Sequence, residues 1–163
     1  MRWVQEESEF ESVFRNARDC ACLDSGRIPT TLEKFILDDV EICTPGFAGL
    51  LQRLMLWSCD MRANYIVLEP DPIWYFHRHF HKYPLLEIAS DDSADAYLSS
   101  LQEDPGGSPA DAVGINWWEN VIVPPSGKWF VHGLHVDDGV HLWVPHDFSS
   151  EVAKTYSWAH RST

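Results

Sequence analysis

The feature that most constrains the fold of this chain is a pair of apolar runs around a short polar turn. The runs are Lys128–Val136 and Val140–Val144, and the turn Asp137–Gly139 separates them. Such a turn favours a three-residue hairpin loop, in which two residues turn right-handed and a glycine takes the positive φ of the bulge. The segment therefore predicts a β-hairpin close to the C-terminus.

Closing the hairpin at this turn predicts a register in which Leu134 faces Leu142. One face would then carry Phe130, His132, Leu134, Val136, Val140, Leu142 and Val144. The other face would carry Trp129, Val131, His135, His141 and Trp143. Because both faces are substantially apolar, we expect a sheet that is covered on both sides. Pro145 has no backbone N–H to give to a neighbouring strand, so the second strand should end there or lie at an edge.

Helical patterns dominate the first half of the chain. Ser8 fits an N-cap, and apolar residues follow it at helical spacing from Phe10 to Ala17. Thr44 and Pro45 fit the N-cap and first turn of a second helix, which runs over 47–61 and is apolar nearly all round. Further helices are expected over 72–82, 91–103 and 149–158, and strands over 64–69, 85–89, 113–118 and 120–123. Short strands at 20–23 and 40–43 are also possible.

Helices come first and strands dominate late, with no repeat and no linker between them. This order predicts a single α+β domain over residues 1–163. Its helices should pack on a mixed, largely antiparallel sheet that includes the C-terminal β-hairpin.

The strongest global signal is the charge, which is −13 at pH 7. Residues 83–163 hold twelve acids and three bases, and the stretch between Lys82 and Lys128 contains no base. A chain with this charge should repel nucleic acids and anionic membranes and attract basic proteins. We therefore expect a protein partner, and neither nucleic acid nor membrane. An acidic surface can equally serve solubility alone.

The chain carries no run of about 18 apolar residues that could span a membrane. Its N-terminal segment is polar and acidic, unlike a signal peptide. The cysteines, Cys20, Cys22, Cys43 and Cys59, have no CxxC spacing, and we expect reduced thiols. Together these features favour a cytoplasmic location.

Histidines are the main candidates for chemistry. On a helix His77 and His81 have the i, i+4 spacing of zinc ligands, but Arg78 stands where the catalytic glutamate of zinc peptidases would follow the first histidine. On a strand His77, His79 and His81 would share one face and could form a three-histidine site. His135 and His141 would oppose each other across the predicted hairpin and could bind a metal or titrate together. We expect structural or surface roles for these histidines, and we assign no metal ligand.

No catalytic signature is present. The sequence has no G-x-S-x-G elbow, no Walker loop and no G-x-G-x-x-G motif. We therefore assign no catalytic residue and expect no cofactor.

The candidate partner-binding residues surround the base-free stretch and the hairpin turn. A tryptophan ringed by acids is a plausible anchor for a basic protein, because tryptophan is enriched at interface hot spots. The candidates are Asp91, Asp92, Asp95, Glu103, Asp104, Trp118, Glu119, Asp137 and Asp138.

Two segments, WWENVIVPPSGKWFVHG (Trp117–Gly133) and YFHRHFHKYPLLEI (Tyr75–Ile88), resemble small acidic immunity proteins of bacterial polymorphic-toxin and contact-dependent inhibition systems. The resemblance covers the latter half of the chain and transfers no binding residue. It implies a non-enzymatic inhibitor that binds one cognate toxin, often a nuclease, and occludes its active site or substrate groove. A metal-dependent enzyme using the histidines and an acidic mimic of nucleic acid remain the alternatives.

Overall fold

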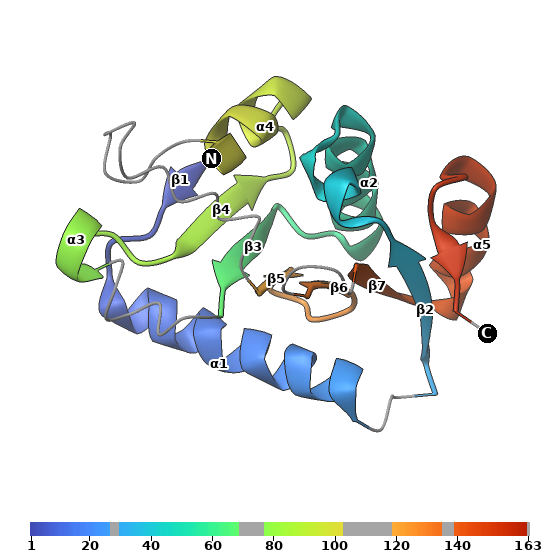
Figure 1. Cartoon of the computed structure of the whole chain (residues 1–163), viewed down its shortest axis with the longest axis horizontal. Coiled ribbons are helices and arrows are strands. Elements are labelled where there is room, and N and C mark those ends of the chain that lie inside the picture. The colour runs from blue at the N-terminus through green and yellow to red at the C-terminus, as the bar shows by residue number, and fades with distance from the viewer. Residues whose placement is uncertain (27–29, 69–76, 103–118, 135–138, 163) are drawn as a thin grey trace.

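The computed structural model describes residues 1–26, 30–68, 77–102, 119–134 and 139–162 (Figure 1). Its centre is an eight-stranded sheet with the order β1-β4-β3-β5-β6-β7-β2-β8. All pairings between these strands are antiparallel. The predicted α+β architecture with a largely antiparallel sheet is therefore confirmed, and the described pairings include no parallel one.

The strands are β1 (Arg2–Trp3), β2 (Leu32–Leu37), β3 (Arg62–Val67), β4 (Leu85–Ala89), β5 (Asn120–Val123), β6 (Phe130–Gly133), β7 (Val140–Pro145) and β8 (His160–Arg161). The helices are α1 (Glu7–Ser25), α2 (Pro45–Ser58), α3 (Arg78–Phe80), α4 (Ala94–Gln102) and α5 (His146–Thr155), with a 3₁₀ turn over Asp39–Cys43. Among the described helices, none combines the length and the apolar character needed to cross a membrane.

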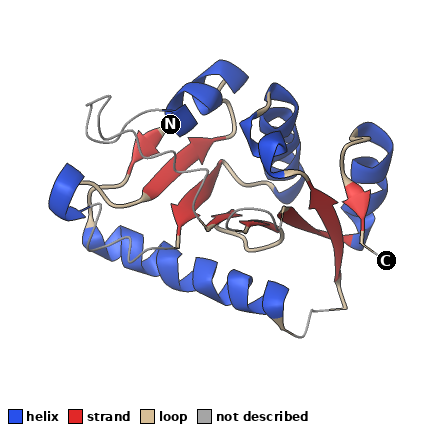
Figure 2. Cartoon of the chain, viewed as in Figure 1, coloured by secondary structure: helices blue, strands red, loops and turns tan. Residues whose placement is uncertain are grey.

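Helices cover the two faces of the sheet unequally (Figure 2). Helix α1 lies alone along one face, where Phe10 and Ala17 are fully buried against Val121 and Phe130. Helices α2, α4 and α5 cover the other face and form the larger apolar core. The central strands β5 and β6 are buried along their whole length. The prediction of a sheet covered on both sides is thus confirmed.

The two predicted N-caps differ in outcome. Thr44 caps α2 as predicted: its Oγ1 accepts a hydrogen bond from the Phe47 N–H at 3.1 Å, and Pro45 is the first helical residue. The predicted cap at Ser8 is wrong, because α1 already begins at Glu7 and its N-cap residue, Glu6, makes no side-chain capping bond. Glu7 and Glu9 in the first turn favour this start through the helix dipole.

The register predicted for the hairpin is wrong. His132 pairs with His141 and Val131 with Leu142, a shift of three residues from the expected pairing. The physical reason is that the hairpin closes earlier, where the Leu134 N–H donates to the Gly139 carbonyl at 3.2 Å, so the loop is longer than three residues. An odd shift exchanges the two faces of a strand.

As a result, the faces of the hairpin are divided differently from the prediction. Phe130, His132, His141 and Trp143 share one face, and Trp129, Val131, Leu142 and Val144 share the other. Two other predictions about the hairpin are confirmed: Gly139 has a positive φ of 78° and Pro145 ends β7. His135 lies outside the described residues.

Several local predictions need correction. Residues 20–23 belong to α1 and not to a strand, and residues 40–43 form a 3₁₀ turn. Of the helix predicted over 72–82, residues 72–76 lie outside the described part, and α3 covers Arg78–Phe80. The strand predicted at 113–118 also lies outside it. The strand at 85–89 has the predicted bounds.

Candidate partner-binding surface and a buried charge cluster

Two of the predicted partner-binding acids are free at the surface beside α4. Asp91 lies in the turn before the helix and Asp95 in its first turn, and both are exposed. Neither carboxylate takes part in an ion pair within the described ranges. They therefore remain candidates for contact with a partner.

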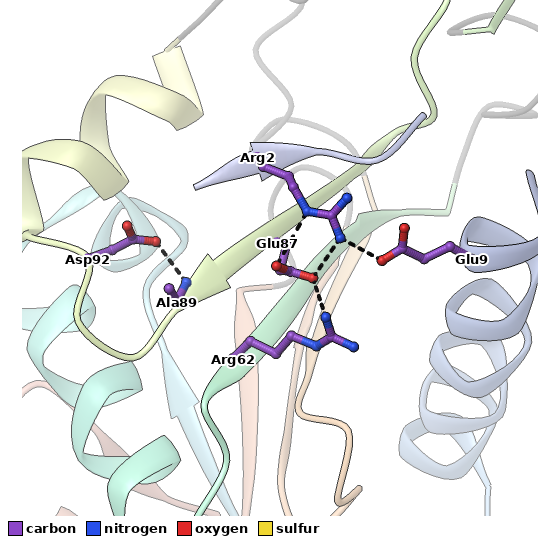
Figure 3. Close-up of polar contacts among 6 residues, drawn as sticks. All are labelled: Arg2, Glu9, Arg62, Glu87, Ala89 and Asp92. Carbon is purple, nitrogen blue, oxygen red and sulfur yellow. Dashed lines mark hydrogen bonds and ion pairs between the residues drawn. The ribbon is translucent and has the colours of Figure 1, made fainter. Parts of the chain in front are cut away.

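Asp92 is instead engaged in holding the fold together. One carboxylate oxygen lies 3.0 Å from the N-terminal ammonium of Met1, and the other accepts the Ala89 N–H at 2.7 Å (Figure 3). These contacts tie the chain start to the turn between β4 and α4. Asp92 is thus already neutralised and is a weaker candidate for binding a partner.

The remaining candidates divide into one described and five undescribed residues. Glu119 is one-quarter exposed and bonds to a buried histidine, as set out below. Glu103, Asp104, Trp118, Asp137 and Asp138 lie outside the described residues.

The basic side chains around β1, β3 and β4 are neutralised by ion pairs (Figure 3). Arg2 contacts Glu9 at 2.7 Å and Glu87 at 3.2 Å, and Arg62 contacts the same Glu87 at 2.7 Å. Glu87 therefore lies between two guanidinium groups and links three strands. The Arg2–Glu9 pair adds α1 to this contact.

A second polar feature, which we call the Asp24 cluster, lies between the last turn of α1 and strands β2, β6 and β7. Its centre is the Asp24 carboxylate, of which 3% is exposed. One oxygen accepts from His132 Nδ1 at 2.8 Å and from His141 Nδ1 at 2.5 Å. The other accepts from Trp143 Nε1 at 2.9 Å and lies 3.3 Å from Lys34 Nζ. Four donors thus satisfy one buried carboxylate, as a buried charge requires.

His132 extends the cluster toward the surface. Its second ring nitrogen, Nε2, lies 2.9 Å from Glu119 Oε1, so the imidazole bridges two carboxylates. An imidazole donates from both nitrogens when it is protonated. The bridge therefore fits an imidazolium between two carboxylate ions.

Within the Asp24 cluster, the pKa of Asp24 is lowered and the pKa of His132 is raised. Burial by itself would raise the pKa of Asp24, but the hydrogen bonds from His132, His141 and Trp143 hold it far below its usual range. Burial by itself would lower the pKa of His132, but its hydrogen bonds to Asp24 and Glu119 raise it. Both shifts favour the charged state of the cluster.

A pocket of about 310 Å³ adjoins the outer end of this bridge. It is lined by Arg18, Ala21, Cys22, Leu68, Glu119, His132 and Leu134. Perturbed ionisable groups beside a cavity occur in active sites, but structural ion pairs perturb a pKa in the same way. The closed set of contacts around Asp24 is explained by its structural role of fixing the end of α1 to the sheet.

Sequence patterns did not indicate this cluster. Asp24 lies beyond the apolar stripe that predicts the first helix, and the incorrect register placed His132 and His141 on opposite faces. The one useful pattern was the presence of two histidines, His132 and His141, in the predicted hairpin. Whether they lie on the same face depends on the length of the hairpin loop, which could not be predicted from the sequence.

The histidines near α3 form no ligand set with the acids and thiols that the structure describes. His77, His79 and His81 are exposed, and the His77 ring stacks on Tyr83 at 4.9 Å between centroids. Among the described residues, no group of three or more His, Cys, Asp or Glu side chains could hold a metal ion. The geometry of this part of the chain therefore gives the metal-enzyme alternative no support.

Comparisons with known proteins found no similar protein. No protein-family model matches the chain, and neither a curated protein nor a solved structure is detectably similar to it. The function must therefore be argued from the fold, the charge distribution and the surface.

Proposed function

We propose that this chain is a non-enzymatic immunity protein that binds one basic bacterial toxin in the cytoplasm and neutralises it. The inhibitor would cover the active site or substrate groove of the toxin, which could be a nuclease. The single observation that carries this proposal is an excess of exposed carboxylates left over after internal ion pairs are formed.

The internal ion pairs use much of the available positive charge. Arg2, Lys34, Arg53, Arg62 and Arg161 each contact an acidic side chain. In contrast, a set of exposed acids has no ion-pair partner in the described ranges: Glu6, Glu7, Glu11, Asp19, Asp38, Asp91, Asp95 and Asp147. The described surface also exposes four bases without an ion pair, Arg15, Arg18, Lys128 and Lys154, so these eight acids leave an excess of negative charge.

Such a surface favours rapid capture of a basic partner. Complementary charge raises association rates above the neutral value of about 10⁵–10⁶ M⁻¹s⁻¹, and salt suppresses the gain. A toxin that acts on nucleic acid must itself present a basic groove to the phosphate backbone. An acidic protein of this size could cover that groove.

The first test is coexpression with the products of neighbouring genes in the source genome. One of these products should stop growth when expressed alone, and this chain should restore growth and copurify with it. Absence of rescue by this chain for every neighbouring product would refute the proposal.

Charge reversal then tests the contribution of the acidic surface. Asp91→Lys combined with Asp95→Lys should slow association with the toxin about tenfold and flatten its dependence on salt. Asp147→Lys is the control, because it reverses an exposed acid on α5, at the other end of the sheet from α4 (Figure 1). Equal effects of the two changes would show that charge acts without a preferred face.

The same assay separates this function from that of a general mimic of nucleic acid. An immunity protein should bind its toxin and ignore unrelated basic proteins such as histones. Comparable affinity for several basic proteins would favour the mimic.

A further inference from the structure

An apolar groove runs beside α2 on the face that also carries Asp91. Leu56 is 78% exposed and Met61 is 79% exposed, more than any other large hydrophobic side chain in the described part of the chain. Both line a concavity of about 820 Å³, the largest among the described pockets. Its lining residues come from α2, from the turn after it, from the turn after β4 and from the end of α5.

Side chains of the described residues do not fill this groove. Gly46 and Gly49 contribute backbone to the lining, and a Cβ placed on Gly49 would meet no atom within 4 Å. Met55 forms part of the lining and is fully buried, whereas Leu56 beside it projects to solvent. The groove thus combines a packed base with apolar side chains that no described residue covers.

The charges around the groove are partly cancelled by pairing. Arg53 lies 2.5 Å from Glu151, so this lining cation is neutralised. The Asp60 carboxylate lines the groove, accepts hydrogen bonds from the Ser126 N–H and hydroxyl, and forms no ion pair within the described residues.

Two acids and two bases that form no ion pair within the described residues lie near the rim. Asp91 follows the lining residue Ser90 and is exposed, and Asp60 lines the groove. The exposed Lys154 precedes the lining residue Thr155, and Lys128 Nζ lies 3.2 Å from the Ser58 carbonyl oxygen, just before the lining residue Cys59. These four charges balance, and the exposed Asp95 on the neighbouring α4 makes the region net negative.

We propose that this groove is the anchor site of the toxin interface, and that it takes a large apolar side chain of the basic partner flanked by lysine or arginine. This inference rests on the proposed function and adds the location and chemistry of the contact. Interfaces commonly join a desolvated apolar centre to a polar rim, and a few buried anchors carry most of the affinity. Leu56 and Met61 would form the centre, and Asp60 and Asp91 the rim.

The test uses a short amphipathic helical peptide of leucine and lysine as the probe. Its titration should shift the methyl NMR signals of Leu56 and Met61 in the full chain. The double variant Leu56→Ser/Met61→Ser should weaken binding about tenfold or more. A leucine and glutamate peptide of the same pattern should not bind.

The control is Val40→Ser, which removes a 64% exposed hydrophobic side chain that does not line the groove. It should leave peptide affinity unchanged. Because the substituted side chains are exposed, all variants should keep the thermal stability of the parent, which circular dichroism checks.

Four outcomes would overturn the inference. They are absence of binding, binding without shifts at Leu56 and Met61, equal binding of the acidic peptide, and a homodimer that Leu56→Ser dissociates in sedimentation. None of these would affect growth rescue by the coexpressed chain, so the proposed function would be judged separately. Conversely, if growth is not rescued but the leucine and lysine peptide binds as expected, the toxin proposal is refuted. The groove would then still be a binding site for ligands that are both basic and apolar.

Discussion

Replacing Asp24 with asparagine should be among the most damaging single changes to stability in this chain. Asparagine keeps the shape of the side chain but removes its charge. If the NH₂ group turns toward Trp143 and Lys34, it faces two groups that can only donate. If it turns toward His132 and His141, it faces ring nitrogens that donate in the protonated imidazoles, so both rings would have to give up the Nδ1 proton to accept from it. Either orientation therefore loses contacts or removes the positive charge of the cluster.

The magnitude follows from the burial of this carboxylate. Hydrogen bonds that involve a charged group contribute about 1.5–3 kcal/mol each, and removing one partner of a buried ion pair costs about 3–5 kcal/mol. Since the Asp24 side chain is only 3% exposed, little of this is recovered by water. We expect Asp24→Asn to lower the free energy of unfolding by about 3–5 kcal/mol.

Urea unfolding followed by circular dichroism measures this loss. Asp19→Asn is the matched control, because it makes the same change on the same helix at an exposed side chain and should alter stability by less than about 0.5 kcal/mol. Glu119→Gln should fall between the two, since it affects one bond at the partly exposed end of the cluster. A loss below about 1 kcal/mol for Asp24→Asn would refute the view that this carboxylate fixes α1 to the sheet.

Two further predictions follow from individual contacts. The pKa of His132 is raised in the folded state, so its stabilising contribution should be complete below its usual pKa of about 6.5 and decline as the pH rises through the raised value. The difference in unfolding free energy between the parent and His132→Gln should therefore shrink at alkaline pH, and a constant difference would refute the imidazolium bridge. Thr44→Ala removes the N-cap of α2 and should lower the free energy of unfolding in urea by about 1 kcal/mol. Thr155→Ala, at the exposed end of α5, is the control and should leave stability unchanged. Equal losses for the two variants would contradict the capping role.

The elements that could be predicted from the sequence are those with local causes. Thr44 and Pro45 mark the start of α2 because the cap involves residues only three apart. The apolar stripe from Phe10 to Ala17 identifies α1 because helical periodicity reports which side meets the sheet. The bounds of β4 follow from a short apolar segment after Pro84.

Features that depend on distant residues were not predictable in the same way. The hairpin register depends on where the loop closes, and the Leu134–Gly139 contact moves that closure away from the Asp-Asp-Gly turn. This shift alone decides whether His132 shares a face with His141 or opposes it. The Asp24 cluster then requires a helix end more than 100 positions away in the sequence.

The distinction between free and engaged acids has the same non-local origin. Asp91 and Asp92 are neighbours with equal charge, yet Asp92 is committed to the N-terminal ammonium and a backbone N–H while Asp91 is exposed. A net charge of −13 therefore says that the chain carries an excess of acids, but not which of them face solvent without an ion pair. Where the surface is negative depends on which charges remain after the ion pairs within the chain are formed.

Helix α2 is apolar on almost all sides, yet part of it faces solvent. Hydrophobic residues all round a helix predict burial on most sides, but the sheet and the neighbouring helices leave the outer side of α2 open. Leu56, and Met61 in the turn after α2, are therefore exposed beside the groove. Apolar side chains joined to exposed acids are the arrangement that the proposed interface requires.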